Sequence, residues 1–389
     1  MPWKVSRPMD AKMEFVTRLR RGERMTDLCR EFGIARKTGY EMRARFDADG
    51  AAGLTPRSRA PRARPHQTLP ALAAVVVAAR RAHPTWGPKK LKVVLEAQLG
   101  HVLPAASTIG GLLTQAGLVT PRRARPRRAS PSAPLSTALA PNDLWCIDYK
   151  GQFRLGDQRY CYPLTMTDQH SRYLLLCAGM AAICEDAALD ACIETFRQYG
   201  MPAAIRSDNG SPFASTGLAG LTALSAAWLR LGIRLERSRP GHPEDNGRHE
   251  RMHRSLKRDT ARPAQATLRL QCARFTTYRA EFNHVRPHEA LAMRRPADVY
   301  VPSRRPYPPT LPTLDYPTYD DVLIVRPKGF VRFYGRREIY IGHALRGQPV
   351  GVREEADGRW LVSFAHLDLG HITPDRKFVP LGLPPTAST

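Results

Sequence analysis

Hydrophobic residues follow three different spacings along the chain, and each spacing predicts a different kind of structure. In the first third, apolar positions recur every three or four residues, which is typical of amphipathic helices. From about residue 143, short alternating runs are interspersed with helical segments, and from about residue 318 only short alternating segments remain. A chain of 389 residues is also long for one domain. We therefore expect a multidomain α+β protein.

Three short helices are predicted at residues 9–48. One face of the first is apolar and is formed by Met13, Val16 and Leu19. The second covers residues 25–32, and Gly33 supplies a turn before the third, at residues 36–46. This order indicates a helix-turn-helix DNA-binding domain at residues 1–52. Its third helix would offer basic side chains to a DNA major groove, namely Arg36, Lys37, Arg43 and Arg45, and an ordinary solvated face is the alternative.

A second helical DNA-binding domain is predicted at residues 69–120. Its last helix, at residues 104–118, looks like a further recognition helix capped by Ser107. Basic linkers are expected at residues 53–68 and 121–142, because these tracts are rich in proline and lack apolar periodicity. Several of their arginines are candidate contacts to the DNA backbone: Arg57, Arg59, Arg122 and Arg123.

Residues 143–300 predict a catalytic α/β core. Three strands joined by tight turns come first, at residues 145–151, 159–168 and 171–179. A helix at residues 184–199 leads to a fourth strand that ends at Asp208, a further helix and a short strand follow, and a long helix starts near Glu244. Three antiparallel strands followed by alternating helices and strands is the order of the ribonuclease-H-like fold with its mixed sheet.

Residues 318–380 contain five short strand-like segments with close turns, which predict a small β-barrel. Its basic residues would make a second DNA surface, with a solvated charged face as the alternative: Arg326, Lys328, Arg332, Arg336 and Arg337.

The net charge of the chain indicates which class of molecule it binds. The formal net charge is +25 and the isoelectric point is near 10.4. Residues 1–140 hold 26 Lys and Arg against 9 Asp and Glu, so this first third supplies 17 of the 25 net charges. A lysine or arginine placed against a phosphate releases condensed counterions, so concentrated basic charge favours nucleic acid, and double-stranded DNA is the expected partner.

Cysteine and hydropathy patterns bear on the compartment. The seven cysteines include no CxxC pair, which disfavours a disulfide framework and a zinc ribbon. The longest apolar run, residues 71–79, is much shorter than the roughly 20 residues that span a bilayer. The N-terminal sequence lacks the apolar stretch of a signal peptide. We expect a cytoplasmic, nucleoid-associated protein without a membrane partner.

Three acids are placed where a metal-dependent reaction on DNA needs them. Asp148 lies in the first predicted strand, Asp208 ends the fourth, and Glu250 lies in the first turns of the long helix. Phosphoryl transfer by two hard cations requires oxygen ligands brought together in this way. The sequence predicts that these carboxylates hold two Mg²⁺ or Mn²⁺ ions, with Asp148 shared between them.

The core motifs resemble those of DDE transposases of bacterial insertion sequences, in the integrase-core branch that includes retroviral integrases. The segments that carry the resemblance occur in the family's order over residues 143–300: WCIDYKGQF, YPLTMTDQHSRYLL, RSDNGSPF, SRPGHPEDNGRHERMHRSLKRD and FNHVRPHEAL. The front segments REFGIARKTGY and GLTPRSRAP are also similar to this family.

The resemblance implies an activity and a substrate. Water would first be activated to nick the end of a mobile DNA element, and the freed 3′-hydroxyl would then attack target DNA. It also implies that the N-terminal helices recognise terminal inverted repeats and that the protein pairs two ends as a homo-oligomer.

The third acid has two candidates. The common family spacing after Asp208 lands on Glu244. The family motif, however, places the acid after N-G-x-x in a helix that continues to LK, and Asn246, Gly247 and Glu250 satisfy it. We favour Glu250 and leave open whether Glu244 contributes. Two basic residues would share the helical face of Glu250 and contact DNA, namely Arg254 and Lys257.

Two other functions are compatible with parts of the sequence. The segment HERMH, from His249 to His253, matches the H-E-x-x-H pattern of zinc proteases, but arginines and Lys257 surround it and no third ligand motif follows. A DNA-binding regulator derived from a transposase would have lost one of the three acids, whereas all three are present.

Overall fold

The computed structural model describes residues 8–56, 67–119, 135–239, 247–335, 338–355 and 358–381. The chain divides into two compact units, Met1–Gln67 and Thr68–Thr389. No described helix is both long enough and apolar enough to cross a membrane. Several predicted DNA contacts and one candidate acid lie outside the described residues: Arg57, Arg59, Arg122, Arg123, Arg336, Arg337 and Glu244.

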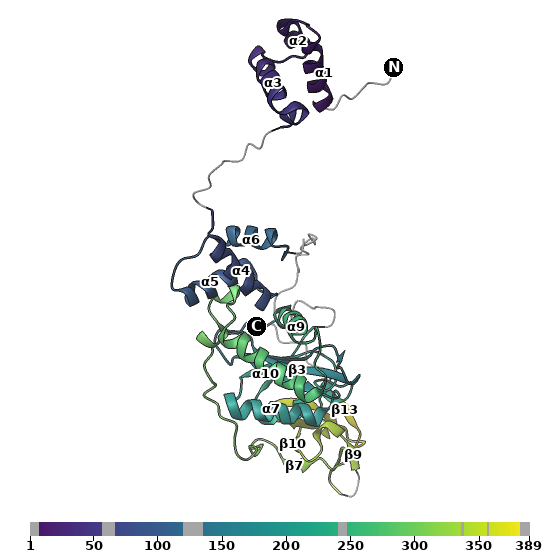
Figure 1. Cartoon of the computed structure of the whole chain (residues 1–389). Helices are drawn as coiled ribbons and strands as arrows, with labels where there is room; N and C mark the ends of the chain where they lie inside the picture. Colours follow the sequence, from purple (N-terminus) through teal and green to yellow (C-terminus); the bar gives the residue numbers. More distant parts are fainter. Residues whose placement is uncertain are drawn as a thin grey trace, which may run out of the picture. The chain divides into compact units, whose positions relative to one another are not determined.

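The first unit is a small helical bundle (Figure 1). It consists of α1 (Pro8–Arg20), α2 (Met25–Glu31), α3 (Arg36–Asp49) and the 3₁₀ turn η1 (Gly50–Leu54). Its core is formed by Phe15, Val16, Leu28, Cys29, Met42 and Leu54. Met13, predicted to share the buried face, is exposed because Phe15 and Val16 turn the core face of α1 away from it. Gly33 adopts a φ of +63° in the turn between α2 and α3, a conformation that favours glycine.

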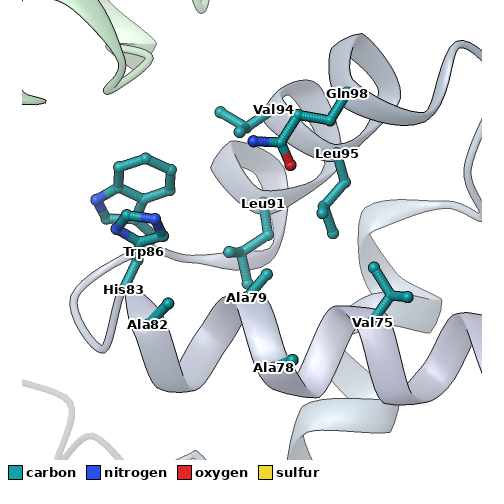
Figure 2. Close-up of a pocket in the computed structure, with 10 residues that line it drawn as sticks. All are labelled: Val75, Ala78, Ala79, Ala82, His83, Trp86, Leu91, Val94, Leu95 and Gln98. Carbon is teal, nitrogen blue, oxygen red and sulfur yellow. The ribbon is translucent and has the colours of Figure 1, made fainter.

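Three further helices form a second bundle at the start of the second unit: α4 (Pro70–Ala82), α5 (Pro88–Leu99) and α6 (Ala106–Gln115). Ser107 was predicted to cap α6, but the helix begins one residue earlier and no side chain caps it. Figure 2 shows an apolar groove between α4 and α5, in which the rings of His83 and Trp86 stack with centroids 3.9 Å apart.

The loop between α4 and α5 contacts the catalytic core. His83 Nδ1 lies 2.9 Å from Glu281 Oε1, and the Thr85 hydroxyl lies 3.2 Å from Asp259 Oδ2. Arg258 donates to the carbonyl of Pro84 at 3.1 Å. The second helical bundle is therefore bonded to the helices that carry and support Glu250.

The core sheet contains antiparallel and parallel pairs, as predicted. Its strands are β1 (Leu144–Tyr149), β2 (Phe153–Arg154), β3 (Tyr160–Asp168), β4 (Leu174–Met180), β5 (Ala204–Ser207) and β6 (Arg234–Arg237). Strand β3 pairs antiparallel with β1, β2 and β4, whereas β1, β5 and β6 run parallel. Three antiparallel strands followed by parallel strands is the mixed order expected of a ribonuclease-H-like fold.

Helices cover both faces of this sheet. On one face, α7 (Glu185–Tyr199) and α8 (Ala223–Arg230) enclose a core that includes Trp145, Phe196 and Trp228. On the other, α9 (Gly247–Thr260) and α10 (Leu268–His284) pack on residues such as Leu174 and Cys177. Successive residues of a strand point to opposite faces, so neighbouring residues of β4 enter different cores. Short 3₁₀ turns complete this region: η2 (Leu218–Gly220), η4 (Glu289–Leu291) and η5 (Pro296–Asp298).

The C-terminal region is built mainly from strands, and the 3₁₀ turn η6 (His343–Leu345) lies among them. The strands are β7 (Asp321–Ile324), β8 (Phe330–Arg332), β9 (Glu338–Tyr340), β10 (Pro349–Glu354), β11 (Trp360–Phe364), β12 (Leu367–Ile372) and β13 (Phe378–Pro380). Five of them form an antiparallel sheet in the order β13–β12–β11–β10–β7, and β8 and β9 form a hairpin. Within the described residues no pairing joins β7 to β13, so the predicted closed barrel is not confirmed. Leu221, Ala226 and Leu229 of the catalytic core contribute to the apolar core of this region.

Candidate active site

Asp148 lies near the end of β1, the strand between β3 and β5 in the core sheet. Trp145 and Ile147 are buried against α7 and α8, so Asp148, the next residue, points to the opposite face. Its Cα pairs with that of Thr165 on β3. The carboxylate is 20% exposed, which leaves it accessible from one side only.

Asp208 follows β5 directly, at the same end of the parallel strands as Asp148. Cys146 pairs with Arg206 across the parallel strands, and Asp148 and Asp208 each lie two residues further on. The Gly210 N–H donates to Asp208 Oδ1 at 3.2 Å, and a Cβ at Gly210 would lie 3.1 Å from Asp208 Oδ2. Glycine at this turn therefore lets the backbone approach the carboxylate.

Glu250 is brought to the same edge by α9. The helix buries a stripe along one side, formed by His249, Met252, His253, Leu256 and Thr260. His253, one turn after Glu250, lies 3.6 Å from Asp148, measured from Nδ1 to Oδ2. Glu250 itself is exposed, at the border of the buried stripe. The helix thus presents this acid beside the sheet without burying it.

The electrostatics of Asp148 show that the three acids interact. Burial first, then the negative charge of Asp208, and to a smaller extent that of Glu250, together raise the pKa of Asp148 to about 7. Lys150 opposes this shift. Like charges held together in this way favour a bound cation, and three carboxylates supply the oxygen donors that Mg²⁺ and Mn²⁺ prefer. The residues therefore fit a hard divalent metal.

His249 and His253 form a second candidate ligand set with Asp148, because one donor atom from each of the three lies within 4.8 Å of the others. Burial lowers the pKa of His249 to about 3 and that of His253 still further, so both imidazoles are neutral. Both rings point inward to β3, where they contact the hydroxyls of Thr165 and Thr167.

Sequence reasoning missed the interior position of these histidines. It gave weight to the charged residues around HERMH, such as Arg251 and Arg254, which lie on the exposed side of α9. The signal that could have found them is the spacing of His249, Met252, His253 and Leu256, which marks one buried helix face. Lys150 was also missed; its charge acts on Asp148 and on both histidines.

Three other acids of the core have structural roles. Asp168 accepts hydrogen bonds from the Asn142 and Ser171 backbone N–H groups, and Asp143 accepts from two backbone N–H groups of the preceding turn. Asp157 accepts from the N–H of Arg159 at 3.1 Å. These carboxylates are used within the fold and lie apart from the three-acid group along the strands.

The predicted DNA-contacting residues lie in two separate places. Arg36, Lys37 and Arg43 are exposed on α3 of the first unit, where Arg45 is half-buried. Arg43 pairs with Asp47 at 3.6 Å. On α9, Arg254 is exposed and Lys257 half-buried on the side that carries Glu250.

Family comparisons agree with this geometry. A family model described as an integrase core domain matches residues 138–243, and a second of the same description matches residues 231–296. Ahead of them, a helix-turn-helix domain matches residues 11–62 and a homeodomain-like domain matches residues 38–113. The two core matches include Asp148, Asp208 and Glu250.

A curated relative shares the core segment. The Gag-Pol polyprotein of baboon endogenous virus (strain M7) is 27% identical over 171 residues, which are 44% of this chain. The chain spans about 9% of the length of that polyprotein.

Two solved structures align with low similarity. A chain of the simian T-cell lymphotropic virus intasome in complex with PP2A regulatory subunit B56 gamma gives a TM-score of 0.38 at 16% identity, covering 77% of this chain and 99% of that chain. The HTLV-2 integrase catalytic core domain in complex with magnesium, in its trimeric form, gives 0.34 at 14% identity, covering 42% and 100%.

The order of these matches along the chain is that of the elements described above. Helix-turn-helix domains come first, and an integrase core domain follows with three acids at one edge of its sheet. The chain therefore carries an integrase core domain that is preceded by helix-turn-helix domains.

Proposed function

We propose that this protein is a transposase that cuts the ends of a mobile DNA element and joins them to target DNA. The observation that carries the proposal is the convergence of Asp148, Asp208 and Glu250 at one end of the strands of an integrase core domain, where the negative charges of Asp208 and Glu250 contribute to the raised pKa of Asp148. The reaction is a polynucleotidyl transfer, in which a water or a 3′-hydroxyl oxygen attacks a phosphodiester.

The three carboxylates would hold two Mg²⁺ or Mn²⁺ ions. Bound metal supplies Lewis acidity that activates the attacking oxygen and stabilises the leaving oxygen. The chain's own contribution is to fix the acids on three rigid elements, β1, the end of β5 and α9. Gly210 supports Asp208, while the inward stripe of α9 anchors the helix that carries Glu250.

The N-terminal domains indicate which DNA the protein would bind. We propose that the helix-turn-helix domain at residues 1–52 and the helical domain at residues 69–120 bind terminal inverted repeats of a bacterial insertion sequence. Basic linkers at 53–68 and 121–142 would track the phosphate backbone. Arg254 and Lys257 would contact the DNA end beside the catalytic core at residues 143–300, and two or more copies would pair two ends.

The β domain at residues 318–380 is proposed to complete the DNA-binding surface. Arg326 is ion-paired with Glu338 at 2.7 Å, which joins β9 to the segment that follows β7. A small closed β-barrel remains the finer expectation for this region. Its strands pack on the catalytic core through α8, so DNA held there would lie on the same unit as the three acids.

The test is cleavage and strand transfer on a duplex that carries the element's flanking ends, with Mg²⁺ or Mn²⁺. Wild type is compared with Glu250→Gln and with Glu244→Gln. We expect only Glu250→Gln to abolish both reactions while retaining end binding in a gel-shift measurement. Loss in Glu244→Gln alone would reassign the third acid, and an inactive wild type that binds ends normally would favour a regulator over a transposase.

A further inference from the structure

Five side chains from three elements form a continuous polar chain behind the proposed metal site. Thr167 Oγ1 lies 2.9 Å from His249 Nδ1, and the other ring nitrogen of His249, Nε2, lies 2.8 Å from Thr165 Oγ1. Thr165 Oγ1 in turn lies 2.6 Å from His253 Nε2. The last ring nitrogen, His253 Nδ1, faces Asp148 Oδ2 at 3.6 Å.

The side chains of this polar row are buried almost throughout. Thr165, His249 and His253 are at most 3% exposed, and Thr167 is 8% exposed. A buried polar group destabilises the fold unless it is bonded, so each proton in this row must have an acceptor. The proton positions can therefore be assigned from the inventory of donors and acceptors.

A neutral imidazole has one N–H and one bare nitrogen, and a threonine hydroxyl has one proton. When Asp148 is an ionised carboxylate it can only accept, so His253 places its Nδ1–H toward it. His253 Nε2 is then bare and accepts the proton of the Thr165 hydroxyl. Thr165 Oγ1 accepts from His249 Nε2–H, and the bare His249 Nδ1 accepts from the Thr167 hydroxyl. Every proton is used once, and all donate in the direction of Asp148.

The alternative arrangements share a proton on His253 Nε2. The Thr165 hydroxyl then donates either to His249 Nε2 or to the main-chain carbonyl of Asp148, which lies 3.2 Å away. In each of them His253 turns the lone pair of Nδ1 toward the Asp148 carboxylate. That contact is repulsive when the carboxylate is ionised, so the first arrangement is favoured.

We propose that His253 is a positioning residue for Asp148, held in its Nδ1–H tautomer by Thr165 and His249 so that it offers a donor to Oδ2. At 3.6 Å the contact is longer than a hydrogen bond and acts as an electrostatic one. It biases the carboxylate toward one orientation, with Oδ2 held on the side of His253. This inference rests on the proposed function, because it assigns Asp148 to the metal site.

The same atoms do not favour a zinc site, although Asp148, His249 and His253 are close enough for one. Both ring nitrogens of His249 and one of His253 are already engaged by threonine hydroxyls. A metal bound through His249 would have to displace a buried hydrogen bond, leaving a threonine without its partner. If the side chains instead donate one to the next from Thr167 to Asp148, all of these hydrogen bonds are kept.

Outer groups that hydrogen-bond a metal ligand typically change metal affinity by about 10- to 100-fold when they are removed. The chain offers a matched pair of substitutions at His253. An asparagine amide can place its N–H where Nδ1–H lies, facing Asp148, whereas a glutamine amide extends to the position of Nε2, facing Thr165. Leucine keeps the volume and offers no donor.

The first experiment reads the tautomers directly. Full-length protein with ¹⁵N-labelled histidine is examined by long-range ¹H–¹⁵N correlation at pH 8.5, without metal, and His249→Gln and His253→Gln assign the two rings. We expect His253 as the Nδ1–H tautomer and His249 as the Nε2–H tautomer. An Nε2–H tautomer for His253 would overturn the proposal, irrespective of any catalytic result.

The second experiment measures Mn²⁺ binding to the full-length protein by calorimetry, with thermal melting to establish that each variant is folded. Asp148→Asn is expected to lose binding, His253→Leu and His253→Gln to weaken it about 10-fold or more, and His253→Asn to retain it. Equal affinity in wild type and His253→Leu, including none in either, overturns the positioning role. Tight 1:1 binding of Zn²⁺ that is lost in both His249→Leu and His253→Leu also overturns it and replaces it by a zinc site.

These outcomes are separable from failure of the proposed function. Loss of Mn²⁺ in Asp148→Asn together with unchanged binding in His253→Leu removes the positioning role and leaves the metal site. A wild type that binds Mn²⁺ in the expected pattern but neither cleaves nor joins DNA removes the transposase activity and leaves the positioning role.

Discussion

The first helical unit and the catalytic core bury different kinds of side chain. The core of the first unit is made of apolar residues, such as Phe15 and Leu28. In the described part of the chain, every buried polar or charged side chain lies between Thr165 and Arg286, apart from Ser363. Burying polar groups is unfavourable unless each is bonded. The interior of the first unit therefore serves only to stabilise its fold, and its function depends on surface residues. The interior of the catalytic core also contains polar side chains, which can take part in its function.

Within the core, two neighbouring strands carry two acids of different kinds. Asp168 on β3 accepts hydrogen bonds from Asn142 and from Ser171, and these bonds oppose the rise in its pKa that burial causes. For Asp148 on β1, burial and the charges of Asp208 and Glu250 raise the pKa to about 7. Asp168 stabilises the fold through its hydrogen bonds. The ionised form of Asp148 is unfavourable in its surroundings, and a bound cation would stabilise it. Substitutions should separate these two roles.

The largest effect is expected at Asp208. Asp208→Asn removes one ligand of the proposed metal site, and metal ions contribute several kcal/mol to transition-state stabilisation, so cleavage should fall by a factor on the order of 10³ or more. The melting temperature should stay near that of wild type. Cleavage of end-bearing DNA at saturating Mg²⁺ measures this. Asp190→Asn, at an exposed position on α7, is the control, and equal activity in the two variants would remove Asp208 from the site.

The second effect tests the first unit as an independently folded carrier. Leu28 is 1% exposed in its core, and Leu28→Ala is expected to destabilise this unit by roughly 2–5 kcal/mol. End binding should be lost while the unfolding transition of the second unit is unchanged, as followed by calorimetry. Met13→Ala, at an exposed position of the same unit, should leave both intact. A single transition that shifts in Leu28→Ala would mean that the two units unfold together.

Much of the architecture follows from local pattern. Strands β1, β3, β4 and β5 and helix α7 occur where alternation and helical spacing predict them, because each element's own sequence sets its periodicity. The fourth strand was predicted to end at Asp208, and β5 ends one residue earlier, at Ser207. Glu250 was chosen over Glu244 from a motif that spans only a few residues.

What the sequence did not reveal depends on contacts between distant segments. His249 and Thr165 are 84 positions apart, and their contact is set by how α9 lies across β3. Met13 was expected in the core because its spacing fits a helical face, but that face is shared with Phe15 and Val16, and the packing of α2 and α3 decides between them. Ser107 lies inside α6 because the helix starts at Ala106.

A third effect concerns the structural acid. Asp168→Asn keeps the shape but replaces one acceptor oxygen by an amide NH₂ group, whose N–H donors then face backbone N–H donors. Unpaired buried donors typically destabilise a fold by about 1–3 kcal/mol. We expect a lower midpoint in urea and unchanged cleavage per folded molecule. A loss of cleavage in folded Asp168→Asn would mean that Asp168 takes part in the reaction. It would contradict the assignment of a purely structural role to this acid.

A smaller effect of opposite sign is expected for Asp148→Asn. A folded-state pKa of about 7, above the usual value of 3.8, means that the folded protein binds this proton more tightly than the unfolded chain does. The stability of wild type therefore falls as pH rises from about 4 to 7, and Asp148→Asn escapes this loss. In EDTA at pH 8 the variant should be more stable by on the order of 1–2 kcal/mol, and the gain should vanish near pH 4. A variant less stable than wild type at pH 8 would contradict the interaction among the acids.

The smallest effect tests whether α3 carries DNA contacts on its surface. Arg36 and Lys37 are exposed at the start of α3. Each lysine or arginine placed against a phosphate contributes about 0.9 to the slope of log binding constant against log salt concentration. Arg36→Ala combined with Lys37→Ala should reduce that slope by up to about 2 and leave the melting of the unit unchanged. Arg20→Ala removes one exposed charge from α1, where it pairs with Asp47, and should leave the slope nearly unchanged. A slope that falls equally in both variants would mean that the unit binds DNA by its overall charge, with no preference for the face of α3.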